Sequence, residues 1–95
     1  MMTNIDCQNG ELFVSGTLNF VTVMSIWNQS LPFIQNEKEI QINLEKIQES
    51  NGAGLALLVE WKCFAKRHNK IITFKNLPEN LLSIANLTGV MQFLT

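Results

Sequence analysis

The stretch IQINLEKIQESNGAGLALL, residues 40–58, decides the fold of this chain. Apolar and polar residues alternate at its start, which predicts a buried strand over about Glu39–Leu44. A polar bend is expected at Gln48–Asn51, and the glycine-rich run Gly52–Gly54 then leads into a helix predicted over about Ala53–His68. A strand end, a short loop and a helix N-terminus therefore meet at one junction. Small α/β domains commonly place their function at such a junction.

Turn and capping residues predict the elements on either side. Asn9-Gly10 is typical of a tight hairpin turn, Gly16 indicates a bulge, and Asn19 is expected to cap a helix in which Pro32 ends or bends the last turn. The remaining predicted elements are strands at Asn4–Cys7, Glu11–Leu18 and Ile71–Phe74, helices at Phe20–Ile34 and Pro78–Leu87, and a short strand or a last helical turn at Val90–Leu94. Asn69 and Gly89 are expected to end the second and third helices.

This order predicts an α/β fold in a single domain, residues 1–95. Alternating strands and helices favour right-handed crossovers and a mostly parallel sheet of four to five strands. The leading hairpin should give one antiparallel edge, and the helices should pack on the sheet. In the first helix the expected inward face is Phe20, Val23, Met24, Trp27, Leu31 and Ile34.

The composition of the chain disfavours several classes of binding partner. The chain is 46% hydrophobic and 16% charged with a net charge of −1, so nothing in its overall charge favours nucleic acid or an anionic membrane as a partner. Its N-terminus lacks the basic and apolar regions of a secretory signal, and no apolar run is long enough to insert in a membrane. Cys7 and Cys63 have no metal-ligand spacing, which indicates free thiols and a cytosolic location.

No set of residues predicts catalysis, a metal site or a cofactor. His68 is the only histidine and is expected at a helix C-terminus, where a cation is favoured. Trp27 and Trp61 fall on expected core faces rather than on ligand walls. Since no nucleophile, base and oxyanion donor can be assembled at the Gly52 junction, we expect no enzyme activity.

Two segments resemble the STAS domain family, named for sulfate transporters and anti-sigma-factor antagonists. FVSGTLNF (13–20) is similar to the second strand and following turn of that family, and INLEKIQESNGAGLALL (42–58) is similar to its strand–loop–helix motif. GLALL (54–58) and VMSIWNQ (23–29) look closest to the solitary STAS subunit of the Mla phospholipid-transport ABC complex of Gram-negative bacteria.

The chain departs from the family at the phosphorylation loop. The anti-sigma-factor antagonists carry Asp-Ser-Ser-Gly there, and its second hydroxyl accepts phosphate, whereas this chain has Asn51-Gly52-Ala53-Gly54. A phosphoryl group needs an oxygen nucleophile, so phosphorylation at the usual position is excluded. Ser50 is the one displaced alternative, and local backbone hydrogen bonding is the expectation for it.

The resemblance implies an interaction subunit that binds and stabilises the ATPase of an Mla-type ABC transporter. Such a subunit would be cytoplasmic, held at the inner membrane through the complex, and would support the lipid asymmetry of the outer membrane. The alternative is an anti-sigma-factor antagonist or a stress-signalling regulator. The second predicted helix carries small or apolar residues outward at helical spacing, and the expected partner-binding residues are Asn51, Gly52, Ala53, Leu55, Ala56, Val59, Glu60 and Cys63.

Overall fold

The computed structural model describes residues 4–94, which form a four-stranded sheet and four helices. The strands are β1 (Asn4–Gln8), β2 (Glu11–Leu18), β3 (Glu39–Ser50) and β4 (Ile71–Lys75). The helices are α1 (Val23–Asn36), α2 (Gly52–Arg67), α3 (Glu79–Thr88) and α4 (Met91–Leu94). The predicted α/β class is confirmed, and of the two possibilities for the last element the helical turn is the one observed.

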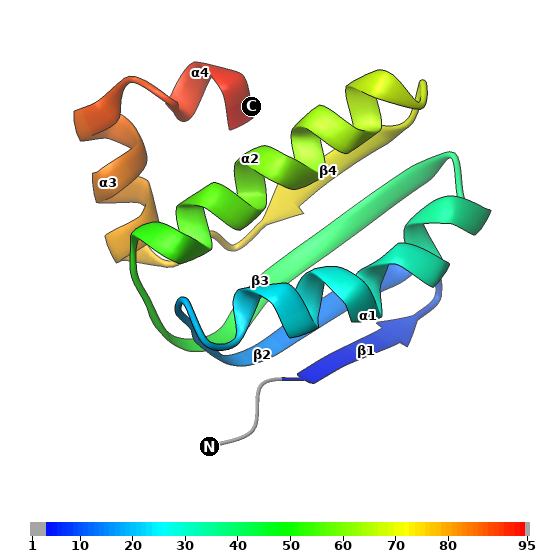
Figure 1. Ribbon diagram of the computed structural model, residues 1–95, viewed down its shortest axis with the longest axis horizontal. Coiled ribbons are helices and arrows are strands. Elements are labelled where there is room, and N and C mark those ends of the chain that lie inside the picture. The colour runs from blue at the N-terminus through cyan, green and yellow to red at the C-terminus, as the bar shows by residue number, and fades with distance from the viewer. Residues whose placement is uncertain (1–3, 95) are drawn as a thin grey trace.

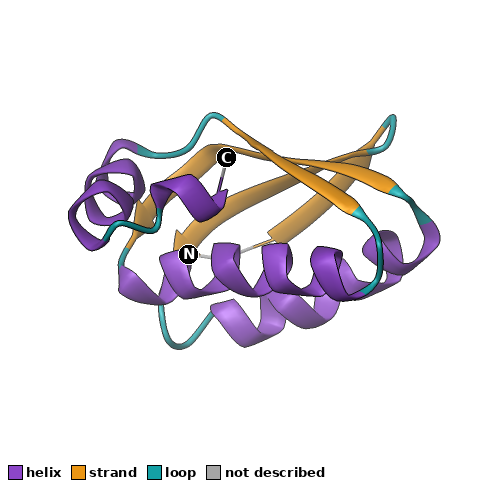
Figure 2. Cartoon of the chain, turned by 90° about the horizontal axis from the view of Figure 1, so that it is seen from above, coloured by secondary structure: helices purple, strands orange, loops and turns teal. Residues whose placement is uncertain are grey.

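The sheet has the order β1-β2-β3-β4. β1 pairs antiparallel with β2, whereas the β2–β3 and β3–β4 pairs are parallel, so the predicted antiparallel edge is confirmed. Helices α1 and α2 lie side by side over one face of the sheet, and no helix of residues 4–94 covers the other face (Figure 1, Figure 2). α3 and α4 lie against α2 at one end of the domain (Figure 1). None of the helices in the described range is long and apolar enough to cross a membrane.

Alternation along the strands places the core between the sheet and the helices. Leu12, Val14 and Leu18 on β2, and Ile40 and Ile42 on β3, are almost fully buried. The turn at Asn9-Gly10 has positive φ at both residues, as the hairpin prediction requires. The predicted bulge is also confirmed, because Gly16 has φ +99° and the β2–β3 register shifts between Gly16 and Thr17.

β3 is longer than the sequence predicted. The prediction of a polar bend at Gln48–Asn51 was wrong, because β3 continues to Ser50 and its second half still pairs with β2. That half has no pairing with β4, whose register on β3 ends at Asn43. Only one side of the segment therefore meets a neighbouring strand. Its polar side chains face solvent while its backbone remains in the sheet, so side-chain composition did not reveal the strand.

Two predicted details at the ends of α1 were wrong. The Asn19 side chain does not cap α1 itself; it accepts from the Val21 and Thr22 amides in a turn that precedes the helix. Pro32 does not end the helix, because it lies inside α1, which continues to Asn36. Proline removes the hydrogen bond to the carbonyl four residues earlier, and the residue there, Asn28, is exposed, so water can replace the missing donor.

The inward face of α1 is also rotated from the predicted one. Its buried residues are Ile26, Ser30 and Ile34, whereas Phe20 and Met24 are 82% and 62% exposed. Ser30 replaces an apolar residue on this face because its hydroxyl has two buried partners. It donates to the Trp27 carbonyl at 2.7 Å and accepts from the indole of Trp61 at 2.9 Å. A pattern of hydrophobicity cannot identify such a serine.

Candidate functional site: the strand–helix junction and the α1–α2 groove

The junction between β3 and α2 consists of one residue, Asn51. Its side-chain oxygen accepts from the Ala53 amide at 2.8 Å and so caps α2, and its own amide donates to the Leu18 carbonyl at 3.2 Å. Gly52, which begins the helix, is exposed. Gly54 packs so closely on β2 that a Cβ atom there would lie 3.2 Å from the Cβ of Leu18. The glycine at position 54 thus brings α2 close to the sheet.

No hydroxyl group occurs at positions 51–54, where the family's phosphorylation motif would lie. Ser50, the displaced alternative, is already engaged. Its Oγ donates to Oδ1 of Asn80 at 2.7 Å, and its carbonyl accepts from Nδ2 of the same side chain. Ser50 therefore links the end of β3 to α3 in a structural role.

The predicted partner-binding residues divide into two groups. Asn51, Gly52, Ala56 and Glu60 are exposed, and Val59 and Cys63 are partly exposed.

Ala53, predicted in the contact loop, and Leu55, predicted beside the outward strip of α2, are both buried, with 3% and 8% exposure. Leu55 belongs to the core cluster that also contains Leu81 of α3 and Leu94 of α4. The packing of α3 and α4 against α2 could not be predicted from the sequence pattern. The contact of all eight residues with a partner remains a prediction.

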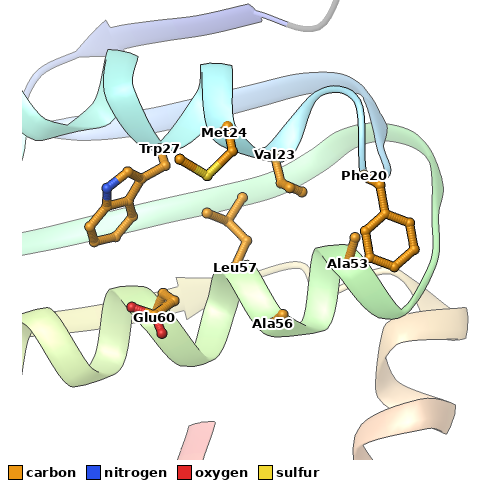
Figure 3. A pocket seen from close by; sticks show the side chains of 8 residues that line it. All are labelled: Phe20, Val23, Met24, Trp27, Ala53, Ala56, Leu57 and Glu60. Atoms are coloured by element: carbon orange, nitrogen blue, oxygen red, sulfur yellow. The ribbon is translucent and has the colours of Figure 1, made fainter.

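An apolar groove of about 360 Å³ runs between α1 and α2 (Figure 3). Its lining residues come from the start of α1 and the turn before it, and from the first half of α2: Phe20, Val23, Met24, Trp27, Ala53, Ala56, Leu57 and Glu60. Phe20 and Met24, which the sequence pattern assigned to the core, are the exposed apolar residues of this groove. Trp27 is only partly buried, and its ring packs edge-on against Phe64 at 5.8 Å.

The chemistry of this groove suits binding rather than catalysis. Among residues 4–94, Glu60 is the only ionisable residue that lines the groove, and a single carboxylate does not form a pair of acid and base groups. Among residues 4–94, no group of three histidine, cysteine or acidic side chains is placed to hold a metal ion. The predicted free thiols are confirmed at both Cys7 and Cys63. Exposed aromatic and methionine side chains beside small alanines are typical of a surface that receives a partner's side chains.

The model of the family described as "Mlab, STAS domain" matches residues 1–95. The chain belongs to the MlaB STAS-domain family. The resemblance read from the strand–loop–helix motif is thereby confirmed, and the MlaB-type match extends over both helices of the groove.

A relative agrees with this assignment, and two solved structures share the fold. The chain is 27% identical over 101 residues to the intermembrane phospholipid transport system binding protein MlaB of Haemophilus influenzae, and the match covers 98% of this chain and 96% of the relative. A chain in the structure of the Acinetobacter MlaFEDB complex in its ATP-bound conformation has the same fold, with a TM-score of 0.79, 24% identity and coverage of 97% and 95%. The unphosphorylated anti-sigma factor antagonist SpoIIAA also shares the fold, with a TM-score of 0.72, 12% identity and coverage of 99% and 86%.

Proposed function

We propose that this chain is the non-catalytic STAS subunit of an Mla-type ABC transporter of phospholipids and that it binds the ATPase subunit of that transporter. The observation that carries the proposal is the match to an MlaB protein over nearly the whole of both chains. The loop without hydroxyl groups at positions 51–54 supports a permanent subunit over a phosphorylation-controlled regulator.

The exposed side of α2 and the adjoining groove are the proposed contact with the ATPase. Ala56 and Glu60 are exposed and line the groove from α2, and Phe20 and Met24 line it from the α1 side (Figure 3). Asn51 and Gly52 are exposed at the start of the helix. Small residues at positions 52 and 56 allow close approach of a partner, and the two large apolar side chains offer area to bury. Together they have the composition of an interface core with a charged residue at its rim.

The mechanism requires only differential binding. A subunit that binds the assembled transporter better than the free ATPase stabilises the assembly in proportion to that difference in affinity. The ATPase would supply the hydrolysis, and this chain would act at the cytoplasmic side of the inner membrane without inserting into it. Its loss should then impair phospholipid transport and the lipid asymmetry of the outer membrane.

The test is purification of the tagged chain from the membranes of its own host, followed by identification of bound proteins and measurement of ATP hydrolysis. An ABC ATPase should co-purify with the wild-type chain, and Ala56→Arg should reduce its recovery at least about tenfold because the new side chain fills the groove. Thr73→Arg on the helix-free face of the sheet is the matched control, since residue 73 is also exposed. Circular dichroism should show that both variants remain folded.

Two results would count against the proposal in different ways. Absence of any ABC ATPase from the wild-type preparation would overturn the function. Full recovery of the ATPase with Ala56→Arg would leave the function standing and show that the contact lies elsewhere on the domain.

A further inference from the structure

Cationic residues gather at the end of α2 and in β4. Residues 61–78 contain five of the seven lysine and arginine residues and no aspartate or glutamate, although the net charge of the whole chain is −1. Four of these five cations occur between positions 62 and 70. The charge of the chain is therefore unevenly distributed, and the cations follow the N-terminal half of α2, which lines the groove.

Three of these cations line a separate open cavity of about 320 Å³. Lys62, Lys66 and Lys70 contribute the charged side chains, and Ile71 and Phe93 are among the apolar residues that complete the wall. Phe93 of α4 is 42% exposed and Ile71 of β4 is 54% exposed, so apolar surface remains open beside the ammonium groups. No acidic residue of the described range 4–94 lines this cavity.

Lys62 is partly buried without a counter-charge among the described residues. Its ammonium donates to the Ile72 carbonyl at 2.5 Å and lies 5.5 Å from the ring centre of Phe74, and both of these partners are neutral. Burial lowers the pKa of Lys62 below its ordinary value. Within residues 4–94, the one salt bridge joins Lys75 to Glu11 rather than involving a lysine of the cavity. An anion bound in the cavity would supply the negative counter-charge that is missing beside the Lys62 ammonium.

Lys70 is held at the rim of the cavity by backbone carbonyls. Its ammonium donates to the carbonyl oxygens of Gln35 and Glu37 at 3.2 and 2.7 Å. Lys66 is exposed and free to turn toward a ligand.

Several groups oppose or assist the three lysines. Glu37 and the strand neighbour Glu39 are the nearest acidic residues along the paired backbone, and neither lines the cavity. The C-terminus of α2 adds roughly half a negative charge, which is smaller than three positive charges. Arg67 lies with Lys66 in the last turn of α2, and His68 is the residue that ends the helix.

We propose that this cavity binds a phosphate group attached to an apolar body, with the three lysines on the phosphate and the wall around Ile71 and Phe93 against the apolar part. Lysine is a point-charge donor well suited to phosphate, and three ammonium groups are enough to balance the two negative charges of a phosphate monoester. Neither the family assignment nor the proposed ATPase contact is needed for this site. The inferred ligand is a lipid-like phosphate ester; inorganic phosphate carries the same charged group and is the alternative that the titration distinguishes.

The test is an NMR titration of the full chain with inorganic phosphate and, separately, with hexyl phosphate. Hexyl phosphate should cause saturable shifts of the amide signals of Lys66, Ile71 and Phe93, and should bind about threefold or more tightly than inorganic phosphate because of its alkyl chain. Lys62→Met and Lys70→Gln should each weaken binding several-fold. Lys46→Gln removes the same charge on the helix-free face, where Lys46 lies over Phe13, and should leave the affinity unchanged.

Three results would overturn all or part of the proposal. Absence of saturable shifts with either ligand up to about 10 mM would exclude the site. Equal weakening by Lys62→Met and Lys46→Gln would mean that only the overall charge matters. Equal affinity for the two ligands would show that the wall around Ile71 and Phe93 does not bind an alkyl chain, and would assign free phosphate as the ligand.

Discussion

The indole nitrogen of Trp61 donates a 2.9 Å hydrogen bond to the hydroxyl of Ser30, and both side chains are completely buried. This bond joins α2 to α1 across the core, while the Ser30 hydroxyl donates in turn to the Trp27 carbonyl. Because its hydroxyl is hydrogen-bonded in this way, a polar serine can occupy a core position. It also fixes the relative rotation of the two helices that form the groove.

Ser30→Ala should lower the free energy of unfolding by about 1–3 kcal/mol, because it leaves the buried Trp61 N–H without a partner. Urea denaturation followed by tryptophan fluorescence measures this loss. Ser25→Ala is the matched control on the same helix, since Ser25 is exposed, and it should change stability by no more than about 0.5 kcal/mol. Equal stability of the two variants would show that the indole finds another acceptor.

Gly54→Ala should destabilise the domain by about 1 kcal/mol, although alanine is the better helix former. The new Cβ would lie 3.2 Å from the Cβ of Leu18 and 3.5 Å from Leu81, and the overpacking costs more than the gain in helix propensity. Gly52→Ala is the control, since nothing lies within 4 Å of a Cβ at that position. Thermal unfolding of both variants distinguishes them, and a Tm for Gly54→Ala at or above that of Gly52→Ala would contradict the close packing.

The stability of the wild-type chain should rise between neutral pH and about pH 10 relative to Lys62→Met. Burial lowers the pKa of Lys62 in the native state, so between the native and unfolded pKa values the unfolded chain binds more protons. The free energy of unfolding therefore increases with pH in that window. Denaturation of the two proteins at several pH values gives the difference directly, and parallel curves would mean that Lys62 is as well solvated as in the unfolded chain.

Incubation with an anti-sigma-type kinase and ATP should leave the intact mass of the chain unchanged. Positions 51–54 have no hydroxyl group, and the Ser50 hydroxyl is already hydrogen-bonded to Asn80. A cognate antagonist with its serine motif should be phosphorylated in the same assay as the control. Addition of one phosphate at Ser50 would favour the alternative function, a phosphorylation-controlled regulator.

Features that depend on local chemistry could be predicted from the sequence. Positive φ angles occur at Asn9, Gly16, Asn69 and Gly89, where turns, a bulge and helix ends were expected. The alternating strand that starts at Ile40 was equally clear. In each case the residue type itself restricts the backbone, so no knowledge of distant contacts was needed.

Features that depend on tertiary contacts could not be predicted. The burial of Ser30 requires Trp61, which is 31 residues away in the sequence. Leu55 is buried in the core cluster that includes Leu81 of α3 and Leu94 of α4, and Phe20 lies in the turn before α1 rather than in the helix. As a result, half of the groove was assigned to the core, because a hydrophobic pattern does not distinguish a core face from the wall of an open groove.

The one-residue connection between β3 and α2 has a mechanical consequence. Asn51 is hydrogen-bonded in both directions, to Leu18 of the sheet and to Ala53 of the helix, so the connection contains no hinge. The outer side of α2 must move as one body with the central strand. A protein that docks on α2 and displaces it should therefore displace β3 as well, because no flexible loop separates the helix from the strand.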